Sequence, residues 1–180
     1  IPGTIDNDIA SSDYTVGFDT AVNTVMDMVD KLRDTSQSHD RCSIVEVMGR
    51  RCGDIALHAG IACGAVAILV PEVPFSIDSI IEKMQRTLRT GKKHFIIIVA
   101  EGVTSVGGVG TVHDIAEEIE ARTGVESRAT VLGHVQRGGA PSARERVLAS
   151  EMGYHAVELL EQGIGNRVVV NHDNKIVDYD

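Results

Sequence analysis

The sequence predicts an α/β fold, a three-layer sandwich in which helices cover both faces of a mostly parallel sheet. Short apolar runs recur at 43–48, 65–70, 95–100 and 129–132. The segments between most of these runs carry apolar residues at three- and four-residue spacing, which is the period of a helix. Strands that alternate with helices along a chain are typical of parallel sheets covered on both faces.

The first helix is expected to begin near Ser12 and Asp13, because apolar residues recur with helical spacing after them. The strand at 43–48 follows this helix. The glycine-containing turn Gly49–Gly53 then separates the strand from a second helix, built of small residues, over 54–63.

The middle of the chain repeats this pattern. The strand at 65–70 is nearly all apolar and stops at Pro71, whose ring cannot continue a hydrogen-bonded ladder. A helix that ends at Gly91 follows, and the run 95–100 is the strongest buried-strand signal in the chain. Residues 102–110 are rich in glycine but lack the Lys-Ser/Thr ending of a P-loop, so we expect a surface loop there.

Two capping boxes mark the later helices. Thr111–Asp114 and Ser142–Glu145 each place a hydroxyl three residues before a carboxylate, which satisfies free N–H groups at a helix start. Gly124 and Gly163 are expected to end these helices. The C-terminal residues 168–177 are typical of a hairpin, with a polar turn between two apolar runs.

Composition limits the function. Hydrophobic residues make up 43% of the chain without a run long enough to cross a bilayer, which indicates a cytoplasmic protein with no membrane segment. A net charge of −9 argues against nucleic-acid binding, which needs clustered positive charge. Cys42, Cys52 and Cys63 show neither CxxC nor Cys/His metal spacing and are expected to be reduced structural thiols.

A hydroxyl and two carboxylates stand together near the start of the chain. Thr4, Asp6 and Asp8 are spaced two residues apart, which forms a compact cluster able to exchange protons and to bind cations. Such a cluster normally follows a strand, and we expect that strand to lie upstream of this sequence.

Basic residues stand near predicted strand ends or in loops of this acidic chain. A guanidinium group suits a phosphate ester, since its planar fork donates two hydrogen bonds to two oxygens. In parallel sheets, ligands collect beyond the carboxyl ends of the strands. The candidate phosphate-binding residues are Arg41, Arg50, Arg128, His134 and Arg137.

Three motifs carry a resemblance to a known family. Residues 2–8 (PGTIDND), 47–50 (VMGR) and 128–139 (RATVLGHVQRGG) resemble, in this order, the motifs of 6-phosphofructokinase of the bacterial, ATP-dependent type. The resemblance extends over essentially all 180 residues. It implies a Rossmann-like, phosphofructokinase-like sandwich and a glycolytic phosphotransferase.

The resemblance implies transfer of the γ-phosphoryl group of MgATP to the 1-hydroxyl of fructose 6-phosphate. Asp6 would be the general base. Thr4 would hydrogen-bond the transferring group, and Asp8 would help to place the magnesium-bound phosphates. Arg50 would neutralise charge on the equatorial oxygens in the transition state.

The resemblance also implies a sugar site and an effector site. The residues implied in the sugar site are Met48, Gly49, Arg50, Glu101, His134 and Arg137, with Arg41 and Arg128 reaching into it from a neighbouring subunit of a homotetramer. The residues implied in an allosteric nucleotide-diphosphate or phosphoenolpyruvate site are Arg33, Lys92 and Lys93. Val66 stands where many bacterial members hold an acidic residue for the effector's magnesium, and a solvated basic edge is an equal alternative.

By the same resemblance, residues 1–17 are a remnant of a larger ATP-binding domain that carries the catalytic loop. Residues 18–135 form the fructose-6-phosphate-binding domain, and 136–180 return to the larger domain. The nucleotide half is expected upstream of residue 1, so neither the ATP site nor a metal site is expected to be complete in this chain. The isolated chain is therefore expected to be inactive.

Two alternatives remain at this stage. A pyrophosphate-dependent relative usually carries Lys directly before the Thr-Ile-Asp motif, where this chain has Gly3. A regulatory module could bind a sugar phosphate without activity of its own. The presence of Thr4, Asp6 and Arg50 argues against that module, because a site that only binds has little need of a base.

Overall fold

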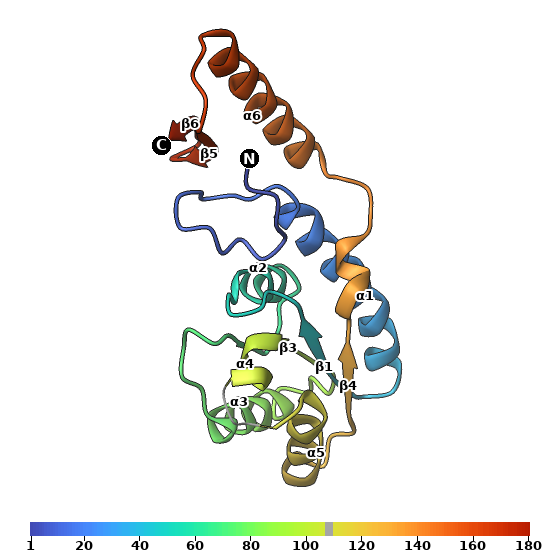
Figure 1. Cartoon of the computed structure of the whole chain (residues 1–180). Coiled ribbons are helices and arrows are strands. Elements are labelled where there is room, and N and C mark those ends of the chain that lie inside the picture. The colour runs from blue at the N-terminus through green and yellow to red at the C-terminus, as the bar shows by residue number, and fades with distance from the viewer. Residues whose placement is uncertain (107–109) are drawn as a thin grey trace.

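The computed structural model describes residues 1–106 and 110–180 and confirms the α/β class (Figure 1). Four parallel strands form a sheet in the order β2-β3-β1-β4. The strands are β1 (Cys42–Val47), β2 (Ala67–Leu69), β3 (Phe95–Ala100) and β4 (Ser127–Val131). β2 is shorter than the apolar run 65–70 because it lies at the sheet edge and pairs with β3 alone.

Helices cover the sheet in two pairs. They are α1 (Phe18–Ser38), α2 (Asp54–Ala62), α3 (Ile77–Leu88), α4 (Glu101–Val106), α5 (Val112–Thr123) and α6 (Ala143–Glu161), with a 3₁₀ helix η1 (Gly133–Arg137). α1 packs against α2 and β1, whereas α3 packs against α5, which covers β1 and β4. Two helical layers with the sheet between them give the predicted sandwich. No helix of the described residues is long and apolar enough to cross a membrane.

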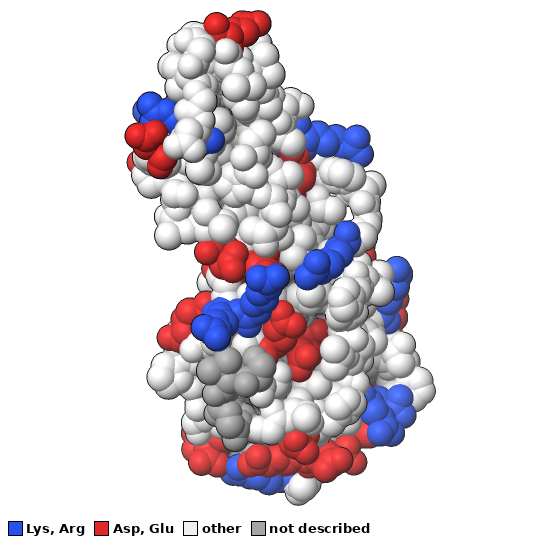
Figure 2. All heavy atoms as spheres, viewed as in Figure 1, with Lys and Arg blue, Asp and Glu red and all other residues white. Residues whose placement is uncertain are grey.

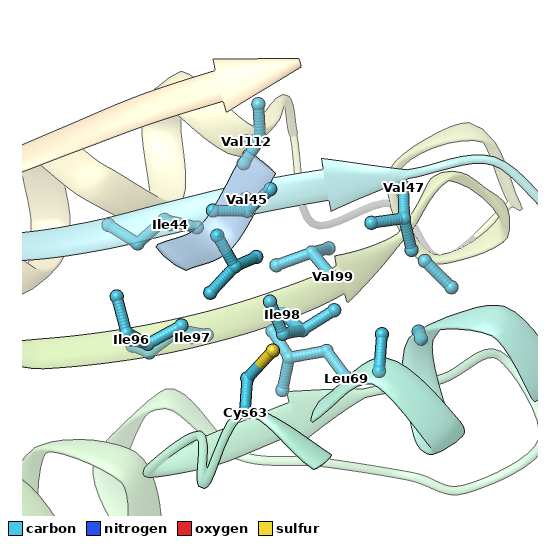
Figure 3. Close-up of a cluster of buried hydrophobic side chains, with 14 of the residues drawn as sticks. Ile44, Val45, Val47, Cys63, Leu69, Ile96, Ile97, Ile98, Val99 and Val112 are labelled. Atoms are coloured by element: carbon cyan, nitrogen blue, oxygen red, sulfur yellow. The ribbon is translucent and has the colours of Figure 1, made fainter. Parts of the chain in front are cut away.

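The main hydrophobic core lies on both faces of the sheet. All six residues of β3 are buried, because helices cover both sides of this inner strand. Figure 3 shows Ile96, Ile97, Ile98 and Val99 of this strand in one cluster with side chains of β1 and with Cys63. This core holds the strand ends, and the loops that follow them, in fixed positions.

A second core lies around α6 and the C-terminal hairpin. The hairpin pairs β5 (Val168–His172) with β6 (Lys175–Tyr179) in antiparallel register, which confirms the prediction. Leu148, Met152, Leu159 and Val169 are buried together, and Tyr14 packs against them from the N-terminal segment. In Figure 1 the N-terminal segment lies between this hairpin and α2.

Two expectations about local structure were wrong. α1 begins at Phe18 rather than near Ser12, because the backbone N–H of Asp13 donates to the carbonyl of Asn171 at 2.7 Å and ties that segment to the hairpin. The glycine-rich stretch 102–110 was expected to be a loop, yet α4 occupies 101–106. The remainder of that expectation, 107–109, lies outside the described residues.

Candidate active site

The site is built at the carboxyl edge of the parallel sheet. β1 and β3 end side by side, since Val47 pairs with Ala100. Glu101 follows β3 directly, and its Oε1 accepts the backbone N–H groups of Gly49 at 3.1 Å and of Arg50 at 2.6 Å. Glu101 therefore fixes the turn after β1. The resemblance assigns Glu101 to sugar hydroxyls, but in this structure its Oε1 accepts hydrogen bonds from the backbone.

The turn after β1 requires an unusual backbone. Gly49 has a φ of +139°, and a Cβ added there would lie 2.4 Å from the carbonyl oxygen of Cys52. Arg50 is also left-handed, with a φ of +54°. Non-glycine residues adopt this conformation at a cost, and they keep it where surrounding contacts enforce it. The two bonds to Glu101 enforce it here.

Asp6 is buried beside Arg50. Its residue is 3% exposed, and its Oδ2 lies 3.3 Å from Nε of Arg50. The backbone N–H of Asp6 donates to Oγ1 of Thr4 at 3.2 Å, which closes the loop locally. Oδ1 is buried and accepts no hydrogen bond from the described residues. Oδ1 is thus a buried acceptor whose hydrogen-bonding capacity is not used by the described residues.

The charge environment makes Asp6 a stronger base than an ordinary aspartate. Burial raises the pKa of its carboxyl group above the usual value, and the negative charge of Asp8 raises it further. The Arg50 guanidinium lowers the pKa, but by less than burial raises it. A carboxylate of raised pKa, with a cation beside it and one oxygen that accepts no hydrogen bond from the described residues, suits general base catalysis.

A cavity of about 500 Å³ opens onto this carboxylate. Its lining joins three segments of the chain: the N-terminal loop, the turn after β1 and the end of η1. The lining residues are Gly3, Thr4, Ile5, Asp6, Asp8, Ile9, Arg50 and Arg137. Figure 2 shows basic side chains across the middle of the molecule, next to acidic ones. Two guanidinium groups around a carboxylate suit a ligand that carries phosphate.

Gln136 is a site residue that sequence reasoning missed. Its side chain is buried, its Oε1 accepts the N–H of Met48 at 3.1 Å, and its Nε2 donates to the carbonyl of Gly133 at 3.1 Å. These bonds hold η1 against the end of β1. A lone glutamine ahead of an arginine gives no signal of such a role. His134 is exposed on η1 and is not among the residues that line the cavity.

Within one chain the structure brings only some of the basic candidate residues together. Arg41 and Arg128 both pair with Glu126, Arg41 through its Nε at 2.8 Å. Arg41 precedes β1 and Arg128 is the second residue of β4, so both lie at the amino edge of the sheet. β1 is six residues long, which separates the two edges by about 20 Å. Arg50 and Arg137 alone of the four arginines line the cavity.

The three residues of the expected effector site have separate surroundings. Arg33, on α1, donates to the carbonyl of Cys63 and lies 3.7 Å from Asp30. Lys93 lies 3.5 Å from Asp40, and Lys92 is exposed beside it. Val66, which stands at the position of the acidic residue in many bacterial members, is 9% exposed. The effector site remains a prediction.

In the ranges 1–106 and 110–180, no group of three or more His, Cys, Asp or Glu side chains is arranged to hold a metal ion. Asp8 lines the cavity beside Asp6. One further carboxylate does not make a magnesium site by itself, since Mg²⁺ needs octahedral oxygen coordination.

The chain is similar to known proteins over most or all of its length. The family model described as Phosphofructokinase matches residues 1–160. An ATP-dependent 6-phosphofructokinase of Clostridium tetani is 59% identical over all 180 residues, and one of Bacillus cereus is 56% identical. The chain covers 54% of each of these relatives, so it spans about half of their length.

Solved structures agree on the fold. The structure of phosphofructokinase from Saccharomyces cerevisiae superposes with a TM-score of 0.90 at 34% identity, over 98% of this chain and 24% of that one. A pyrophosphate-dependent phosphofructokinase from Marinobacter aquaeolei superposes at 0.82 with 23% identity, over 98% of this chain and 49% of that one. The second shows a shared fold alone. The family model covers residues 1–160, well over half of the sequence, so this chain belongs to the phosphofructokinase family.

Proposed function

We propose that the chain supplies the base and the sugar-phosphate site of an ATP-dependent 6-phosphofructokinase. The reaction is transfer of the γ-phosphoryl group of MgATP to the 1-hydroxyl of fructose 6-phosphate. The observation that carries the proposal is the Asp6 carboxylate, which is buried beside Arg50 with Oδ1 free of hydrogen bonds from the described residues.

In this proposal the Asp6 carboxylate accepts the proton of the 1-hydroxyl as the hydroxyl oxygen attacks phosphorus. The proton becomes acidic as the new bond forms, so a carboxylate is a sufficient base. Arg50 neutralises charge on the transferring phosphoryl group, and Thr4 hydrogen-bonds it. Arg137 holds the 6-phosphate at the other side of the cavity, with His134 beside it on η1. Met48, Gly49 and Glu101 form the wall of the sugar site.

ATP is favoured over pyrophosphate as the donor. The relatives at 56–59% identity carry the name ATP-dependent, whereas the pyrophosphate-dependent structures are 21–23% identical. Gly3 supports the same choice, since the lysine typical of the pyrophosphate enzymes is absent at this position. Magnesium would arrive with the nucleotide, and Asp8 would help to place its phosphates.

We further propose the division into residues 1–17, 18–135 and 136–180. Two separate clusters of buried apolar side chains support it, one around the sheet and one around α6 and the hairpin. Arg41 and Arg128 are proposed to serve the site of a second copy in a homo-oligomer, because they face the opposite edge from Asp6. The effector role of Arg33, Lys92 and Lys93 belongs to the same set of proposals.

The test is a kinetic comparison in a protein of the relatives' length that carries this sequence, called the full-length form below. Asp6→Ala is expected to lower kcat by a factor of about a thousand or more while KM for fructose 6-phosphate changes little. An equal loss of turnover and of affinity for fructose 6-phosphate would make Asp6 a binding residue. The isolated 180-residue chain is expected to show no transfer, because the nucleotide is not held in line. Turnover by the isolated chain would overturn that expectation.

A further inference from the structure

Asn7 lies between the two carboxylates of the site and has its own set of bonds. Its φ of +55° is left-handed, a conformation that asparagine tolerates better than most residues. Its Nδ2 donates to Oδ2 of Asp54 at 2.8 Å and to the carbonyl of Asp13 at 3.3 Å. Its Oδ1 accepts from the backbone N–H and the hydroxyl of Thr15, at 3.0 and 3.3 Å. Both atoms of the side-chain amide are thus engaged.

These bonds connect the catalytic loop to a second element. Asp54 is the first residue of α2, four residues after Arg50. The N-terminal loop and the segment 50–54 therefore meet twice, through Asp6 with Arg50 and through Asn7 with Asp54. The Asn7 bond joins residues 47 positions apart in the chain. The relative position of base and guanidinium depends on these two contacts.

The ion pair is the weaker of the two as a positioning contact. The Arg50 side chain is 71% exposed, and ion pairs with an exposed partner hold their geometry poorly. The short side chain of Asn7 donates to the charged carboxylate of Asp54, and the same side chain is held by a hydrogen bond from Thr15. A hydrogen bond to a charged group is shorter and stronger than one between neutral groups.

We propose that Asn7 is a positioning residue, which sets the Asp6 carboxylate against Arg50 by anchoring the catalytic loop to Asp54. The proposal rests on the proposed function for its kinetic consequence. In the alternative, Asn7 has a purely conformational role and only accommodates the left-handed turn. The two differ because positioning requires the specific bond to Asp54, whereas the turn requires only the backbone conformation.

An exchange of the two side chains separates these alternatives. Asn7→Asp keeps a residue that tolerates the left-handed conformation but places two carboxylates in contact. The double variant Asn7→Asp/Asp54→Asn restores a hydrogen bond with donor and acceptor reversed. Asn166→Asp is the matched control, because Asn166 has a φ of +58° between α6 and β5.

In the full-length form, Asn7→Asp is expected to lower kcat about a hundredfold, the effect of misplacing a catalytic group by about 1 Å, with KM for fructose 6-phosphate nearly unchanged. The double variant is expected to regain most of that loss, and Asn166→Asp should match the parent. A kcat for Asn7→Asp near that of the parent would overturn the proposal. So would a double variant as slow as Asn7→Asp alone.

Amide hydrogen exchange in the 180-residue chain gives a readout independent of activity. The amides of Asp6 and Thr15 both donate within the loop, to Thr4 and to Asn7. They are expected to exchange about tenfold faster in Asp54→Ala, since opening of the loop becomes easier, while buried amides such as Ile97 stay unchanged. Unchanged exchange at Asp6 and Thr15 would overturn the anchoring role even if the full-length form had no kinase activity. If Asn7→Asp fails to fold, Asp54→Ala still tests the anchoring contact.

Discussion

Glu145 caps a helix to which it does not belong. It lies in the first turn of α6, yet its Oε1 accepts the backbone N–H of Gly17, just before α1, at 2.6 Å. Its Oε2 accepts both the N–H and the hydroxyl of Thr20 at 3.1 Å. The capping box predicted at Ser142 is therefore used in a different way. Ser142 does accept the N–H of Glu145 at 3.2 Å, but the Glu145 carboxylate crosses to α1.

Replacement of Glu145 is expected to loosen α1 from α6. Glu145→Ala removes the acceptor for three donors, and we expect the free energy of unfolding to fall by about 2 kcal/mol or more. Urea denaturation of the 180-residue chain measures this change. Glu161→Ala, at the exposed end of α6, is the control, and an equal loss there would contradict a specific role for Glu145.

Asp6 is expected to destabilise the isolated chain at neutral pH. Its raised pKa means that the folded state binds the Asp6 proton more tightly than the unfolded state does. The contribution of Asp6 to stability is therefore greatest at a pH below the ordinary aspartate pKa and is lost as the pH rises through the folded value. We expect Asp6→Ala to raise the free energy of unfolding by about 1 kcal/mol at pH 7, with the difference shrinking toward pH 3. A difference independent of pH would contradict this origin.

Gly49 is expected to tolerate no side chain. Gly49→Ala would bring a Cβ to 2.4 Å from the Cys52 carbonyl oxygen at a φ that alanine avoids. We expect a loss of about 2–3 kcal/mol in unfolding free energy, measured by thermal and urea denaturation. Gly153→Ala on α6 meets no atom within 4 Å and should be neutral or slightly stabilising. Equal behaviour of the two variants would show that the turn after β1 can relax.

Arg137 is expected to act on substrate affinity. In the full-length form, Arg137→Ala should raise KM for fructose 6-phosphate between about tenfold and a hundredfold, the effect of one charge-assisted contact. The value of kcat should fall much less. Arg86→Ala, exposed on α3, should change neither constant. An unchanged KM for Arg137→Ala would remove this residue from the phosphate site.

Arg128 is expected to complete the site of another copy. Asp6→Ala and Arg128→Ala should each impair the full-length form, yet a mixture reassembled from equal amounts should regain activity. In a two-fold interface, random pairing leaves about a quarter of the sites with both residues intact. Activity of the mixture that never exceeds the sum of the separate variants would place Arg128 outside the shared site.

The strands, most helix ends and the hairpin could be predicted because local rules decide them. The run 95–100 has the composition of a strand buried on both faces, and β3 matches it residue for residue. Gly124 ends α5 in the left-handed conformation, and Thr111 forms its full capping box. The sequence also allowed the choice of candidate site residues, because a hydroxyl, a carboxylate and a guanidinium group can take part in binding or catalysis in any fold. These residues are Thr4, Asp6, Asp8 and Arg50.

Only the tertiary structure decided which of these groups meet. By itself the sequence determined the α/β class, the family resemblance and the candidate residues of the N-terminal loop. It did not show that, within one chain, the sheet separates Arg41 and Arg128 from Arg50 by the length of β1. It gave no signal for the distant partners of Asn7, Gln136 and Glu145, which lie 47, 88 and 128 positions away in the chain. Such bonds depend on how the elements pack, and a polar side chain has no periodic pattern that reports its distant partner.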